Sequence, residues 1–166
     1  MKKTQLSIYR SIILPLTLLL FFNIISFSQE KILPLSGMWK IKLDSLNKGH
    51  NEKWFSQKLT DEIYMPSTLD EAGYGKRQTE KEDFHLNRIF KYTGPAWYQK
   101  EISIPADWQN KRISIYLERA LWQTEVWIDN SYLGKNLTLS TPHGFALPAD
   151  MKSGKHTITI CVDNSV

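Results

Sequence analysis

The sequence predicts an all-β domain, a β-sandwich or jelly roll, that follows an N-terminal signal helix. Three observations predict this class. Short segments with alternating apolar and polar residues recur along the chain, turn-forming residues separate them, and no segment sustains a helical period. The alternating segments are residues 38–43, 101–104, 112–118, 123–129 and 156–163.

Each segment places one set of side chains on a face that we expect to be buried, because side chains alternate between the two faces of a strand. In chain order these residues are Trp39, Ile41 and Leu43, then Ile102 and Ile104, then Ile113, Ile115 and Leu117, then Thr124, Val126 and Ile128, and last Ile158, Ile160 and Val162. The opposite faces are expected to be polar, although they include Trp127 and Cys161. A lone Cys among Val and Ile is usually a small buried hydrophobe, and without a second Cys no internal disulfide can form.

Turn residues delimit these strands. Residues 129–131 (Asp-Asn-Ser) predict a hairpin turn, and residues 152–155 (Lys-Ser-Gly-Lys) precede the last strand. Residues 51–59 are a weak candidate for a turn or two of helix. Residues 65–93 form a long segment that we expect to be a functional or disordered loop, with a charged, solvated stretch at 76–83. The prolines lie between strands, as strand hydrogen bonding requires: Pro66, Pro95, Pro105, Pro142 and Pro148.

The first 28 residues have the layout of a secretory signal peptide. Lys2, Lys3 and Arg10 form a basic start, residues 11–25 are mainly apolar, and residues 26–28 (Ser-Phe-Ser) supply small residues where signal peptidase cleaves. The alternative is an uncleaved membrane anchor, but the apolar run is short for a span of about 20 residues. We therefore expect a periplasmic or secreted domain of residues 29–166 that leaves the membrane after cleavage.

Charge and motifs argue against several classes of function. The chain has 21 basic and 17 acidic residues, and loss of the three basic signal residues leaves a formal net charge of +1. No basic stripe is present, so we expect no nucleic-acid partner. The sequence also lacks a Gly-rich phosphate loop, a Cys pair, a Gly-x-Ser-x-Gly elbow and His residues at metal-ligand spacing. We expect no cofactor and no metal.

Carboxylates and aromatic residues could still act on a sugar. Spacing alone leaves open an acid–base pair among Glu118, Glu125 and Asp129, but these acids lie on polar faces, where ordinary surface carboxylates are far commoner. We therefore predict no catalytic residue. An aromatic face stacks on the apolar C–H face of a sugar, although most aromatic residues serve as core. Beyond Trp39, which belongs to the expected core, the candidates for sugar stacking are Trp97, Tyr98, Trp122 and Trp127.

A series of sequence blocks carries a more specific signal. They are residues 35–44 (LSGMWKIKLD), 65–70 (MPSTLD), 92–100 (YTGPAWYQK), 117–119 (LER), 122–129 (WQTEVWID), 139–143 (LSTPH) and 162–164 (VDN). In this order they resemble the N-terminal sugar-binding domain of family 2 glycoside hydrolases, the β-galactosidase and β-glucuronidase group. The resemblance spans essentially the whole chain after the signal.

The resemblance implies a jelly-roll sandwich similar to galactose-binding domains. In such enzymes an immunoglobulin-like domain and a barrel with two catalytic glutamates follow, and neither glutamate has a counterpart here. The resemblance also implies that one loop closes a side of the active site. By position residues 85–91 resemble that loop, so Asn87 and Arg88 are the first candidates for substrate contact, with a solvated loop pair as the alternative.

Residues 136–143 are the second candidate region, with His143 either contacting substrate or ordering its own loop. This region departs from the family pattern. Leu137 stands where relatives often carry Asp or Asn, and Leu121 and Gln123 stand where His and Glu are expected around Trp122. An apolar Leu137 cannot hydrogen-bond a sugar.

The leading interpretation is the sugar-binding domain, as a fragment, of an exported β-galactosidase-like hydrolase. The chain alone would then be inactive, and its partners would be a carbohydrate and the remaining domains of the hydrolase. Two alternatives remain. One is a free-standing carbohydrate-binding module without catalysis, and the other is a structural or adhesion β-sandwich that keeps only the scaffold.

Overall fold

The computed structural model describes residues 30–80, 83 and 86–165. The predicted signal peptide, residues 1–28, lies outside the described residues. Residues from Leu35 onward form one compact unit. No helix among the described residues is long and apolar enough to span a membrane.

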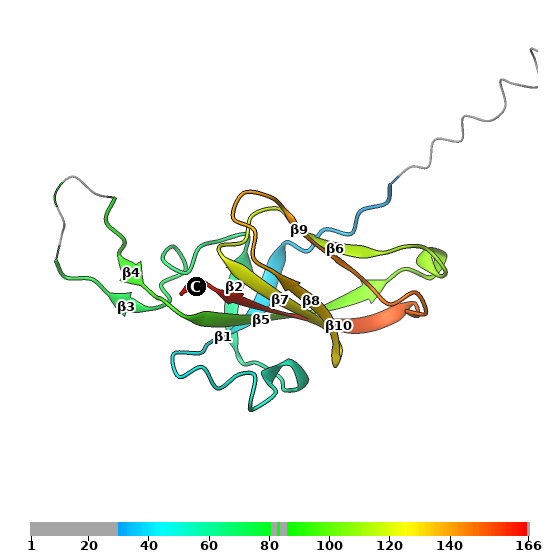
Figure 1. Ribbon diagram of the computed structural model, residues 1–166, viewed down its shortest axis with the longest axis horizontal. Helices are drawn as coiled ribbons and strands as arrows, with labels where there is room; N and C mark the ends of the chain where they lie inside the picture. Colours follow the sequence, from blue (N-terminus) through cyan, green and yellow to red (C-terminus); the bar gives the residue numbers. More distant parts are fainter. Residues whose placement is uncertain (1–29, 81–82, 84–85, 166) are drawn as a thin grey trace, which may run out of the picture. The chain divides into compact units, whose positions relative to one another are not determined.

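This unit is built from antiparallel strands, as the alternation predicts (Figure 1). Its largest sheet has six strands in the order β2-β1-β5-β10-β7-β8, while β6 pairs with β9 and β3 with β4. In chain order the elements are β1 (Gly37–Leu43), the 3₁₀ turn η1 (Trp54–Ser56), β2 (Asp61–Met65), β3 (Lys76–Arg77), β4 (Phe90–Lys91), β5 (Pro95–Ile104), the 3₁₀ turn η2 (Ala106–Trp108), β6 (Ser114–Leu117), β7 (Gln123–Ile128), β8 (Ser131–Asn136), β9 (His143–Ala146) and β10 (Gly154–Asp163).

The main core fills the space between the six-stranded sheet and the β6–β9 pair. Ile115 on β6 and Phe145 on β9 belong to the same buried cluster as residues of the large sheet. Those residues are Trp39, Ile41, Ile63, Val126, Ile128, Ile158 and Ile160. All except Ile63 and Phe145 were predicted to face inward. The jelly-roll β-sandwich prediction is therefore confirmed.

The outer face of the large sheet is also partly buried, which corrects the prediction that each strand buries only one face. Trp97, Trp127 and Cys161 point to this face and are each at most 4 % exposed. Trp54 and Leu59, from the connection between β1 and β2, complete a second apolar cluster with them. We call this connection, residues 44–60, the lid, because its Trp54 and Leu59 side chains cover the outer face of the sheet.

The structure resolves three expectations about connections. Asp129 has a positive φ of 52° and turns β7 into β8, as the Asp-Asn-Ser sequence predicts. Helix in residues 51–59 is limited to the three residues of η1. Part of the long segment 65–93 is ordered as the short hairpin β3–β4, which Asp70 fixes by accepting a hydrogen bond from the Phe90 amide (2.6 Å).

Candidate functional site

Strand register brings several connecting segments to one end of the sandwich, which we call the loop end. Pro95 at the start of β5 pairs with Asp163 at the end of β10, and Asp163 pairs with Gln123 at the start of β7. The end of β8 is adjacent, because Asn136 pairs with Thr124. The segments 92–94, 118–122 and 137–142 therefore leave the strands at the same end, beside the end of β10.

His143 links one of these segments, 137–142, to strand β7. Its Nδ1 lies 2.6 Å from the Thr124 hydroxyl on β7, and its Nε2 lies 2.7 Å from the Thr138 carbonyl. A carbonyl can only accept, so Nε2 carries a proton and donates. His143 is 1 % exposed, so it orders the 137–142 segment from within the protein and presents no ring surface to solvent.

A partly buried polar network braces the opposite side of the loop end. Asn164 accepts a hydrogen bond from the Gly94 amide (2.8 Å) and donates to the Tyr92 carbonyl (3.0 Å). The Tyr92 hydroxyl donates to the Pro95 carbonyl (2.7 Å) and accepts from the Asp44 amide (2.9 Å). Burial raises the pKa of the Tyr92 hydroxyl to about 12, so it stays protonated as this donor. The motif residues 92–94 and 162–164 are thus joined, although sequence alone gave no reason to pair them.

Asp44 is the centre of this network. Its carboxylate is 2 % exposed and accepts hydrogen bonds from the Lys48 and Gly49 amides, both at 2.7 Å, and from the Trp97 indole at 3.2 Å. The carboxylate thereby shapes the first turn of the lid and fixes it to the sheet. The sequence contained Asp44 in its first motif but did not indicate this bracing role.

The aromatic candidates take different positions. Trp97 is fully buried between the sheet and the lid, and its indole packs on Trp127 with ring centroids 5.2 Å apart. Tyr98 points to the opposite face and packs against the main core, where burial raises the pKa of its hydroxyl. Trp97 and Trp127 are core residues with almost no exposed surface, so they cannot stack on a sugar. Tyr98 is only partly buried, and its contact with a substrate stays a prediction.

The remaining candidates keep exposed surface. Trp122 is half-buried at the loop end, where its amide donates to the Asp163 carbonyl (3.3 Å). Asn87 and Arg88 are exposed on the segment that leads into β4. Figure 1 shows the β3–β4 hairpin projecting from the sandwich. Their contact with a substrate stays a prediction.

The loop end also carries exposed apolar side chains. Leu121, Leu137 and Leu139 are 67 %, 51 % and 55 % exposed on the two segments that flank β7 and β8. Leu121 and Leu137 are two of the positions that depart from the family pattern. Polar substrate groups would gain no hydrogen bond from them, whereas another protein surface could bury them.

Within residues 30–80, 83 and 86–165 no group of three or more His, Cys, Asp or Glu side chains could hold a metal ion. Cys161 is buried, and burial raises the pKa of its thiol, which keeps it in the unreactive neutral form. The loop end is thus a braced framework that carries exposed loops.

Comparison with known proteins decides the family. Residues 32–165 match the family described as glycosyl hydrolases family 2, sugar binding domain. The chain belongs to this family. The domain is 29 % identical over 100 residues to a β-glucuronidase of Paenibacillus borealis, and 29 % identical over 91 residues to one of Formosa agariphila. These alignments cover 60 % and 55 % of the chain but only 15 % and 8 % of the two relatives.

Solved structures show the same fold. A β-glucuronidase from an uncultured Clostridium species superposes with a TM-score of 0.64 at 23 % identity, over 81 % of this chain and 22 % of that one. A β-glucuronidase from Ruminococcus gnavus in complex with D-glucaro 1,5-lactone gives a TM-score of 0.65 at 19 % identity, over 82 % and 23 %. The family prediction is confirmed, and these relatives are named β-glucuronidases where the sequence suggested a β-galactosidase-like enzyme.

Proposed function

We propose that this domain is the N-terminal part of an exported family 2 glycosidase and contributes loop-end residues to the binding of a β-glycoside. The family match over residues 32–165 carries this proposal. The braced loop end supports it, because a scaffold of hydrogen-bonded strands can hold binding loops in fixed positions. Export rests on the signal-like residues 1–28.

The proposed substrate of the whole enzyme is a β-glucuronide, since the relatives with the matching first domain are named β-glucuronidases. The matched part of the chain covers less than a sixth of those relatives. We propose that hydrolysis belongs to the part that the chain does not cover. The exposed side chains of Leu121, Leu137 and Leu139 support the proposal that further domains follow this one, because those domains could cover them. Without that cover we expect residues 29–166 to fold but to self-associate at high concentration.

The test compares the chain with the longer protein encoded from the same start codon. Each is incubated with 4-nitrophenyl β-D-glucuronide and 4-nitrophenyl β-D-galactoside, and release of nitrophenol is followed. We expect the longer protein to hydrolyse the glucuronide and the chain alone to hydrolyse neither. Turnover by the chain alone would contradict the division of labour.

Variants of the longer protein then test the segment that leads into β4 and on to the loop end. Arg88→Ala is expected to raise KM about 10-fold if the guanidinium contacts substrate, which corresponds to one charge-assisted hydrogen bond. Arg112→Ala is the matched control, since Arg112 is also exposed but precedes β6 at the opposite end of the sandwich. Equal KM values for the two variants would remove Arg88 from the substrate site.

A further inference from the structure

A concave surface lies on the outer face of the six-stranded sheet, beside the lid. It has a volume of about 650 Å³ and is open to solvent. Strands β1, β2, β5 and β10 supply its floor, the lid residues 55–58 form one wall, and the turn residues 129–130 form another. The volume falls within the range of about 300–1,000 Å³ that is usual for small-molecule sites. We call this surface the outer groove.

The groove is built from polar groups of both signs. Three lysines and three carboxylates are among its lining residues: Lys40, Lys58, Lys100, Glu62, Glu101 and Asp129. The Lys100 ammonium is turned to the Trp39 side of the sheet, where it donates to the Ser36 and Met38 carbonyls. Most of the remaining charge is paired within the protein, because Lys40 binds Glu62 (2.7 Å) and Lys155 binds Glu101 (3.0 Å). Paired charges give the groove little net field with which to select an anion or a cation. Donors next to acceptors instead match hydroxyl groups, each of which can donate and accept.

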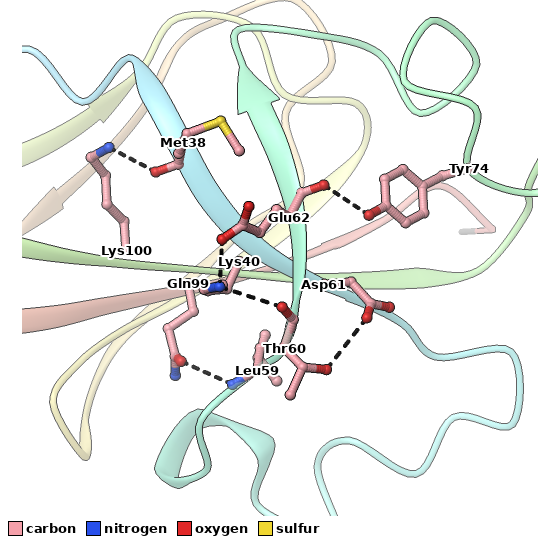
Figure 2. A network of polar contacts seen from close by, with 9 residues as sticks. All are labelled: Met38, Lys40, Leu59, Thr60, Asp61, Glu62, Tyr74, Gln99 and Lys100. Carbon is pink, nitrogen blue, oxygen red and sulfur yellow. Dashed lines mark hydrogen bonds and ion pairs between the residues drawn. The ribbon is translucent and has the colours of Figure 1, made fainter.

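The polar floor is held in place before any ligand arrives. The Lys40 ammonium lies 2.7 Å from a Glu62 carboxylate oxygen and 3.4 Å from the Thr60 carbonyl, as Figure 2 shows. These two acceptors use two of its three N–H donors, and the third can be given to a ligand. Gln99 fixes the wall, because its amide accepts from the Leu59 amide (3.2 Å) and donates to the Gln57 carbonyl (2.9 Å).

Apolar surface lies at both ends of this polar floor. Phe55 lines the lid side, and its ring is stacked on Trp127 with an interplanar angle of 2°. Met38 lines the other side, where it pairs in register with Tyr64 on the edge strand β2. Tyr64 is 64 % exposed and lines a smaller adjoining hollow that shares Glu62 with the groove. Aromatic faces flanking hydroxyl-binding groups fit the alternating apolar and polar faces of a sugar chain.

We propose that the outer groove is an accessory binding site for a neutral oligosaccharide, separate from the loop end. Its location is independent of the proposed loop-end function, because Met38, Glu62 and Tyr64 lie on the open face of β1 and β2 and contribute nothing to the loop-end network. An enzyme with this site would hold a polysaccharide chain on one surface while another surface meets the scissile bond.

The experiment titrates the ¹⁵N-labelled protein with cellotriose, β-1,4-galactotriose and, as the anionic comparison, trigalacturonic acid, up to about 10 mM each. We expect at least one neutral trisaccharide to shift the amide signals of Lys40, Gln57 and Asn130. Lys40→Ala/Glu62→Ala removes the ion pair without leaving an unpaired charge and is expected to weaken binding about 10-fold. Tyr64→Ala is expected to weaken it about 3- to 10-fold.

Tyr116→Ala is the matched control, because Tyr116 is 63 % exposed on β6 in the other layer. The Tyr116→Ala variant should bind the neutral trisaccharide with the same affinity as the unaltered protein. The proposal is overturned if no neutral trisaccharide shifts the groove amides, or if trigalacturonic acid binds there more tightly. Shifts confined to the Trp122 indole would also overturn it, while they would support sugar binding at the loop end. Shifts that follow protein concentration without sugar would assign the groove to self-association instead.

Discussion

Replacement of Asp44 by Ala tests how the lid is attached to the sandwich. The substitution removes the acceptor of three hydrogen bonds, two from backbone amides and one from the Trp97 indole. Asp44 is only 2 % exposed, so these three donors would lose their acceptor in a largely buried site. An unsatisfied buried donor costs about 1–3 kcal/mol, and partial access of water to the turn amides reduces the total. We expect a loss of about 3–5 kcal/mol from a domain whose total stability is of the order of 5–15 kcal/mol.

Urea unfolding followed by tryptophan fluorescence measures this loss, because three Trp side chains lie in the cluster between the lid and the sheet. With a slope of about 2 kcal/mol per M, the midpoint should fall by about 2 M. Asp150→Ala is the control, since Asp150 is exposed, and it should shift the midpoint by less than about 0.3 M. A similarly small shift for Asp44→Ala would refute the claim that this carboxylate attaches the lid.

Two further predictions concern packing and pH. Gly49→Ala would place a Cβ 2.3 Å from the Nε1 of the buried Trp97, so we expect a loss of about 3 kcal/mol in the same unfolding assay, whereas Gly144→Ala, whose Cβ meets nothing within 4 Å, should be tolerated. If Gly49→Ala lowered the free energy of unfolding no more than Gly144→Ala does, the lid could move aside to admit the methyl group. The hydrogen bond from His156 Nδ1 to the Asp129 carboxylate (2.8 Å) raises the pKa of His156 above its usual 6.5. The resulting stabilisation is complete below about pH 6.5 and is lost as pH rises through the folded-state pKa, and an NMR titration should show this pKa falling in Asp129→Asn. An unchanged pKa in that variant would contradict the assigned cause.

The period-two alternation was sufficient to predict the strands and most of the main core. Trp39, Ile115 and Ile160 are buried, as the alternation predicted. A strand with one buried face requires apolar residues at every second position, and this pattern can be recognised in the sequence. The sequence left two roles open for His143, substrate contact and ordering of its own loop. Its 1 % exposure and its two hydrogen bonds within the protein favour the second role.

The lid could not be predicted in the same way. Burial of Trp97 and Trp127 depends on a connection that crosses the outer face of the sheet, and alternation within a strand does not reveal what covers its second face. The adjacent aromatic pair Trp54 and Phe55 in that otherwise polar connection is the one local signal that could have indicated it. The groove was also missed, because it combines β1, β2, β5 and β10 through long-range pairing.

The central claim is that this chain is the first domain of a longer family 2 glycosidase. The most direct measurement is the DNA sequence beyond codon 166, translated in all three frames. The account predicts coding sequence for an immunoglobulin-like domain and a barrel with two catalytic glutamates. A stop codon followed by unrelated sequence would contradict it, and the chain would then act as a carbohydrate-binding module or a structural domain without catalysis.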